Sequence, residues 1–248
     1  MAKQSGLGDN LYIHGYDLSG DINALGNVGG GPAVLEQTGI DKSAFERIGG
    51  VRDGRLQMTS YFNPATDRSH LRLSALPTSS VHAAYFRGTT LGNPAACLVA
   101  KQVNYDGNRG DDGDFKFAVD AQGTDFGLQW GRSLTAGVRT DTGATDGASI
   151  DTTASASFGA QAFLQAFALT GTDVTVKIQD SADNSTFADV TGLTFTQLTA
   201  GNTAERLATS NTATIRRYLR VATVTTGGFS SLAFAVVIVK NPIAGQVF

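Results

Sequence analysis

The residue types most often used in catalysis are scattered along this 248-residue chain. The three histidines, His14, His70 and His82, do not have the regular spacing of metal ligands. The sequence has no Gly-x-Ser-x-Gly elbow, no phosphate-binding loop and no His-Glu-x-x-His motif, and the glycine-rich stretch Gly26–Gly31 misses the dinucleotide fingerprint. We therefore predict that the chain is not an enzyme and needs no cofactor or metal.

Two aspartate-rich stretches resemble calcium loops but break the pattern that calcium requires. Counting from Asp106, the sixth place holds Asp111 where an EF-hand has glycine, and the twelfth holds Phe117 where it has glutamate. The stretch Asp180–Asp189 departs similarly, with Ala182 at its third place. Solvated turns are favoured over calcium sites in both.

Arg216, Tyr218 and Arg220 share one face of a predicted strand, because side chains alternate with a period of two. Two interpretations are open. The face can offer a sugar or phosphate a cationic and aromatic shelf, or its cations can pair with acidic residues of a neighbouring strand. The second, structural interpretation is favoured.

Composition restricts the partners. The net charge of −3 leaves no basic excess for tight nucleic-acid binding. The N-terminus lacks the apolar core of a signal peptide, and the longest apolar run, Leu232–Val239, is too short to cross a bilayer. We expect a chain made in the cytoplasm without a membrane anchor, with Cys97 as a buried core thiol.

The elements that must position these residues are mainly β-strands. With 30 glycines and only three glutamates among 22 acidic residues, the composition favours turns and strands over helices. Alternating polarity predicts a strand over 56–62, and one short helix is expected from a cap at Thr66 or Asp67 to Pro77. Further strands are predicted over 10–13, 18–22, 32–37, 81–86, 95–104, 114–120, 126–130, 162–169, 174–179, 214–223 and 232–239.

Three parts are predicted along the chain. Residues 1–135 form a β-sandwich or barrel with the short helix, and residues 150–248 form a second β-sandwich of immunoglobulin-like or jelly-roll kind. Residues 136–149 are small and polar, which predicts a linker. Two glycine-rich segments of the first part, 20–31 and 39–54, are expected to be loops that order only against neighbouring molecules.

The first part resembles the major tail tube protein of long-tailed, non-contractile bacteriophages. The resemblance rests on Tyr16-Asp17-Leu18-Ser19, on a glycine-rich loop, and on the Arg-Ile-Gly-Gly-Val-Arg-Asp-Gly phrase that opens the stretch Arg47–Phe62. The second part is similar to domains appended to phage structural proteins, through residues 176–190 and 217–221. Such domains project from the outside of the tube.

This resemblance implies a virion protein that is assembled in the host cytoplasm into stacked, hexameric rings forming the tail tube. Its implied partners are other copies of itself, the tape measure protein, the tail terminator and distal tail proteins, and DNA in transit during genome ejection. Two alternatives remain open: a capsid decoration or head protein, and a carbohydrate-binding module for host adhesion.

One acidic stretch suggests how a tube could pass DNA. Between Asn104 and Asp125 the chain has six aspartates against Arg109 and Lys116. On a strand over 114–120, Asp114, Lys116, Ala118 and Asp120 would form the polar face, and Phe115, Phe117 and Val119 would enter the core. We consider two placements, one in which Asp114, Lys116 and Asp120 face the lumen and repel phosphates, and one in which they form an outward, solvated hairpin.

Overall fold

The computed structural model describes residues 5–75 and 79–244, and it confirms a chain that is mainly β. Across these residues there is one short α-helix, α1 (Ser69–Leu73). In the same ranges, no helical segment has the length and hydropathy needed to span a bilayer.

The chain divides into two compact units, each built from segments that are distant in sequence. The first, which we call the sandwich unit, comprises Met1–Gly20, His82–Cys97 and Gln129–Phe248. The second, which we call the hairpin unit, comprises Asp21–Val81 and Leu98–Leu128. These units differ from the three consecutive parts predicted from the sequence, because strands pair with partners more than 100 residues away and composition carries no record of that pairing.

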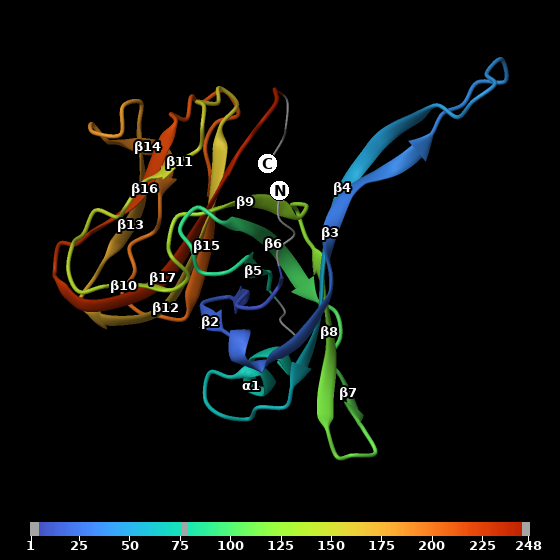
Figure 1. Cartoon of the computed structure of the whole chain (residues 1–248), viewed down its shortest axis with the longest axis horizontal. Helices are drawn as coiled ribbons and strands as arrows, with labels where there is room; N and C mark the ends of the chain where they lie inside the picture. Colours follow the sequence, from blue (N-terminus) through green and yellow to red (C-terminus); the bar gives the residue numbers. More distant parts are fainter. Residues whose placement is uncertain (1–4, 76–78, 245–248) are drawn as a thin grey trace. The chain divides into compact units, whose positions relative to one another are not determined.

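The sandwich unit contains two antiparallel sheets (Figure 1). The order of the larger one in this unit is β15-β12-β17-β9-β6-β5-β1-β2, with β10 also paired to β17. Its strands are β1 (Asn10–Ile13), β2 (Tyr16–Asp17), β5 (Val81–Phe86), the start of β6 (Pro94–Gln102), β9 (Gln129–Ser133), β10 (Arg139–Asp141), β12 (Ala160–Gly171), β15 (Thr203–Ala208) and β17 (Phe229–Lys240). The smaller sheet has the order β11-β16-β13-β14, from β11 (Ile150–Asp151), β13 (Thr175–Ser181), β14 (Ala188–Thr194) and β16 (Tyr218–Val224).

Apolar side chains from both sheets form one core. Alternate residues of β12 and β17, such as Leu164 and Val236, share a single buried cluster with Val176, Ile178 and Val221 of the smaller sheet. All five are fully excluded from solvent. The chain beyond residue 150 therefore belongs to a β-sandwich, as predicted, and no sheet of the described residues closes on itself.

The segment predicted as a linker, residues 136–149, is ordered by polar contacts. Its strand β10 pairs with β17, from Arg139↔Phe234 to Asp141↔Leu232. The buried Asp141 carboxylate accepts hydrogen bonds from Arg139 Nε at 2.6 Å and from Thr223 Oγ1 at 2.8 Å. Backbone pairing and this ion pair hold the segment, so it does not need bulky side chains.

The hairpin unit contains the antiparallel order β3-β4-β8, in which the end of β6 and β7 also pair with β8. The strands are β3 (Ile22–Glu36), β4 (Arg47–Tyr61), β7 (Asp106–Arg109) and β8 (Phe115–Gly123). Leu56 and Met58 of β4 are buried on the same face of the sheet as Phe117 and Val119 of β8, and the four form a small core.

The glycine-rich segments predicted as loops are most of a long β-hairpin. Residues 22–31 lie in β3, residues 47–54 lie in β4, and the pairing runs from Ile22↔Ser60 to Glu36↔Arg47. The prediction of loops was wrong because a ribbon exposed on both faces has no apolar alternation for a sequence pattern to reveal. Glycine also serves here as a packing residue, since a Cβ on Gly30 would lie 2.3 Å from the Asp53 carbonyl oxygen.

The helix is shorter than predicted and is capped differently. Arg68, not Thr66 or Asp67, holds the N-cap position, and its side chain makes no capping bond. The buried Asp21 carboxylate instead accepts a hydrogen bond from the Ser69 N–H at 3.1 Å, across 48 residues of chain. The predicted stop at Pro77 lies outside the described residues. Residues 19–21, predicted as extended, form a 3₁₀ turn. At its start the Ser19 N–H donates to the Asp17 carboxylate.

Two histidines stack inside the sandwich unit. The rings of His14 and His82 lie 6.1 Å apart with an interplanar angle of 15°, and neither Nδ1 has a hydrogen-bond partner in the described part of the chain. Gln165 bridges the two segments, accepting from the Gly15 N–H at 2.7 Å and donating to the His82 carbonyl at 3.0 Å. Burial lowers the pKa of both rings. For His82, the nearby His14 and Arg206 lower the pKa further, to about 4.

This pair predicts a loss of stability in mild acid. A ring with a pKa of about 4 when folded and about 6.5 when unfolded is neutral in the native state, so the unfolded state binds more protons between these values. The free energy of unfolding should therefore fall by about 1–3 kcal/mol as the pH is lowered from 6.5 towards 4. Urea titrations across this range should show a flatter dependence for His82→Gln. An unchanged slope in both His14→Gln and His82→Gln would contradict the assignment, and His70→Gln is the control.

Candidate functional site

The predicted lumen residues lie on or next to the polar face of the β4–β8 pair. The register places Arg55 opposite Gln122, Gln57 opposite Asp120, and Tyr61 opposite Lys116. On the other face Phe117 and Val119 are buried, as the alternation predicted. Phe115 departs from the prediction, because 39% of it is exposed at the end of the strand.

Asp120 is the best-anchored charge on this face. Only 9% of the residue is exposed, and its carboxylate accepts from Arg55 Nε at 3.0 Å and from Gln57 Nε2 at 3.2 Å. The Asp120 N–H donates to Asn104 Oδ1 at 2.6 Å. Hydrogen bonding to Arg55 is the main cause that lowers the pKa of Asp120, so it stays ionised at neutral pH.

Asp114 and Lys116 form a separate, more exposed ion pair. The hydrogen bond to Asp114 is the main cause that raises the pKa of Lys116, whose ammonium also lies 5.4 Å from the centre of the Tyr61 ring. The structure therefore places Lys116 and Asp120 in β8 and Asp114 immediately before it, and it brings only Asp114 and Lys116 into contact.

Both cations of this face are paired, but the face keeps an excess of carboxylates. Arg55 pairs with Asp120, and Lys116 pairs with Asp114. Asp106 and Asp112 are exposed and line the same hollow as Asp114 and Lys116. The role of Arg55 as the partner of Asp120 could not be predicted from the sequence, because it depends on the register between β4 and β8. No group of three or more histidine, cysteine or acidic side chains suited to a metal occurs among the described residues.

The cationic face of β16 pairs with acidic residues, as the favoured interpretation predicted. Arg220 lies 2.7 Å from Asp146, and Arg216 lies 3.8 Å from Asp180. The Arg220 guanidinium also stacks 4.1 Å from the centre of the Phe187 ring. Arg220 is held by both contacts, whereas Arg216, which lies just before β16, remains 47% exposed.

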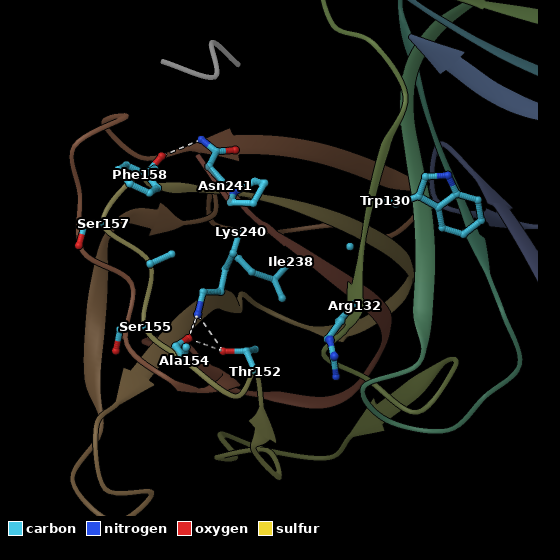
Figure 2. A pocket seen from close by; sticks show the side chains of 13 residues that line it. Trp130, Arg132, Thr152, Ala154, Ser155, Ser157, Phe158, Ile238, Lys240 and Asn241 are labelled. Carbon is cyan, nitrogen blue, oxygen red and sulfur yellow. Dashed lines mark hydrogen bonds between the residues drawn. The ribbon is translucent and has the colours of Figure 1, made fainter. Parts of the chain in front are cut away.

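A cleft of about 610 Å³ opens in the sandwich unit beside β9 and the end of β17 (Figure 2). Lys240 Nζ donates to Thr152 Oγ1 at 2.8 Å and to the Ala154 carbonyl at 2.6 Å, and the Asn241 amide donates to the Phe158 carbonyl at 2.7 Å. Figure 2 shows the Trp130 indole directed away from Lys240. The described lining has no carboxylate, histidine or cysteine.

The most unusual surface is the distal half of the β3–β4 hairpin, which we call the ribbon (residues 30–54). Figure 1 shows it extending past the end of β8. In β3 no residue is buried, and in β4 the first seven residues lack burial as well. Large apolar side chains are nevertheless frequent on it, with exposed fractions of 46% to 110% at Val34, Leu35, Ile40, Phe45, Ile48 and Val51.

Backbone groups of the ribbon are also open at both edges. In the described residues β3 pairs with β4 alone, and β8 covers β4 only from Arg55 to Tyr61. An uncovered strand edge presents unpaired N–H and C=O groups that another chain can use. The ribbon thus offers apolar side chains and hydrogen-bonding edges together.

No family model and no curated protein matches the sequence. Among solved structures, the chain is similar to a chain of the virion of a native gene transfer agent particle, with 12% identity, a TM-score of 0.43, and coverage of 52% of this chain and 98% of that one. It is also similar to a chain from the tail of an empty gene transfer agent particle with C6 symmetry, with 13% identity and a TM-score of 0.41. That match covers 52% of this chain and 98% of the other. The Dit protein of phage SPP1, a hub adsorption protein, is similar with 10% identity and a TM-score of 0.35. That match covers 94% of this chain and 99% of the other. Similarity at this level does not establish a function.

The two ion pairs of the polar face should differ in their effect on stability. Asp120→Ala leaves Arg55 and Gln57 without their acceptor beside a buried position, and should lower the free energy of unfolding by about 1–3 kcal/mol. Asp114→Ala removes an exposed pair and should change stability within experimental error. Urea unfolding of both variants makes the comparison, and equal losses would show that Asp120 is not the anchor.

Proposed function

We propose that the chain is a structural subunit of a phage tail that associates with copies of itself into stacked rings, forming the tail tube. The ribbon is the observation that carries this proposal. Its apolar side chains, exposed faces and open edges are all features of a surface that a partner covers in the working assembly.

A two-stranded ribbon of this length gains little from its own folding. Isolated hairpins are at best marginally stable in water, because they bury little apolar surface. The exposed Val51 and Ile48 add a cost in water that contact with another molecule would recover. The first half of the tube motif, residues 47–54, lies in the ribbon, which links the sequence resemblance to the exposed surface.

Rings are the expected product of such contacts. Repeated contact between two different patches on identical chains produces closed rings or open stacks, according to the rotation between copies. Sixfold symmetry is the order that the resemblance to tail tube proteins implies. The tape measure protein inside and the terminator and distal proteins at the ends follow from the same resemblance.

In this proposal the polar face with Asp114, Lys116 and Asp120 lines the lumen. Its arginine and lysine are already engaged by carboxylates, so they would gain little from phosphates and release few counterions. A hydrated wall whose cations are already paired would let DNA pass without holding it. The residues beyond 150, in the sandwich unit, would serve as the outer decoration.

Shortening the ribbon should abolish assembly while preserving the fold. Gly31 and Asp53 are cross-strand partners, so a two-residue Asn-Gly turn can replace residues 32–52 between them. The removed side chains are exposed or only partly covered, and the midpoint of thermal unfolding should therefore change little. Light scattering and electron microscopy should show rings or tubes for the parent and monomers for the shortened chain.

The point variant Val51→Asp should weaken assembly in the same direction. Ile243→Asp, at a comparably exposed apolar position of the sandwich unit, is the matched control and should assemble normally. A monomeric parent, or a shortened chain that still forms rings, would refute the proposal.

A further inference from the structure

We propose that the tip of the ribbon in one copy docks on an aromatic cluster at the opposite end of β4 in the next copy. This inference rests on the proposed self-association and names the two patches that meet. The tip comprises residues 37–46, between β3 and β4, and the cluster comprises Phe62, His70, Tyr105, Phe115 and Phe117.

The cluster is a continuous set of ring contacts. Phe62 lies 4.5 Å from His70 and 5.6 Å from Phe115, measured between ring centres. Phe117 stacks on Tyr105 at 4.1 Å with an interplanar angle of 8°, and it meets Phe115 edge to face at 4.7 Å. The tightness of these contacts fixes the rings in place and makes the cluster a rigid surface.

The outer rings of the cluster are left uncovered by the chain itself. Phe117 is 7% exposed, whereas Phe62 is 42% exposed and Phe115 is 39% exposed. Two half-exposed phenylalanines side by side form an apolar patch with a buried aromatic floor. Central, well-packed aromatic residues of this kind dominate the energetics of protein contacts.

The tip presents exposed apolar side chains. Phe45 is 64% exposed and Ile40 is fully exposed, so both project from the end of the hairpin. Arg47 lies 4.8 Å from the centre of the Phe45 ring and limits its movement on one side. Narrow apolar projections on a hairpin suit a shallow patch of aromatic rings.

Charge opposes the contact only weakly. At the tip, Lys42 pairs with Asp41 and with Glu46. Next to the cluster, Lys116 pairs with Asp114, and Arg72 pairs with Asp67. Lys42 is shared by two carboxylates, so the tip keeps one negative charge, and Asp112 adds another beside the Lys116–Asp114 pair. These exposed charges are screened by salt, and the burial of apolar surface has to outweigh them.

The two patches of one copy cannot reach each other. They are separated by the length of β4, whose fourteen steps from Arg47 to Tyr61 span roughly 45 Å at about 3.3 Å per residue. Each patch is therefore available only to another molecule. Because the patches differ, their contact is head-to-tail and repeats from copy to copy.

Disulfide trapping tests the contact directly. One preparation carries Phe45→Cys, a second carries Phe115→Cys, and they are mixed before assembly and then oxidised. The native Cys97 is fully buried, and burial raises the pKa of its thiol, so it does not compete. The mixture should give a disulfide-linked dimer at least tenfold more abundant than either preparation alone, and a chain with both substitutions should give a ladder of higher multimers.

Complementation provides a second measurement that does not need an exact sulfur geometry. Ile40→Asp with Phe45→Asp disables the tip, and Phe62→Asp with Phe115→Asp disables the cluster. Each double variant alone should be monomeric, and an equimolar mixture should stop at one-to-one dimers, because one intact tip and one intact cluster remain. Circular dichroism verifies folding, and Ile243→Asp with Val224→Asp, two exposed positions outside both patches, is the control.

The outcomes separate this inference from the proposed function. A parent chain that stays monomeric overturns both. A parent that assembles while the mixed cysteines give no dimer and the cluster variant still polymerises overturns the docking site alone. Equal trapping in a single-cysteine preparation would indicate a symmetric contact and would also overturn it.

Discussion

The antiparallel pairing of β12 with β17 is the interaction on which the sandwich unit depends. It runs from Ala160↔Lys240 to Gly171↔Phe229, and β15, β9 and β10 attach to one or other of these two strands. Alternate residues of the pair supply the floor of the core, and Val236 also donates its N–H to the Thr135 hydroxyl at 3.2 Å. Sheet order, core and the placement of residues 136–149 all follow from this register.

Sequence patterns located elements well wherever one face was buried. The strand over 81–86 is observed with the predicted bounds, and the strand over 114–120 is off by one residue at its start and three at its end. Burial imposes a period of two that is visible in the residues themselves. The ribbon was predicted only in part, as the strand over 32–37, because neither of its faces is buried. The helix cap was misassigned because Asp21, which accepts from the Ser69 N–H, is distant in sequence.

Unit boundaries and charge pairing were harder to predict, because both depend on contacts between residues distant in sequence. Whether residue 132 lies beside residue 238 is determined by long-range pairing, which local composition does not encode. Asp120 was predicted to be polar and on the correct face, but its partner Arg55 became visible only with the β4–β8 register. The acidic stretch therefore overstated the negative charge of that face, since a count along the chain omits cations that fold back onto it.

The local character of the ribbon has a consequence for the order of folding during synthesis. Its strands are joined by a turn of ten residues, whereas β12 must wait for β17, which ends at Lys240. Hairpins form within about 1–10 μs, while non-local sheets form much more slowly. A nascent chain would thus expose its apolar ribbon on the ribosome well before the sandwich unit is complete. Chains on one polysome would bring such ribbons close together, so premature association must be limited during translation.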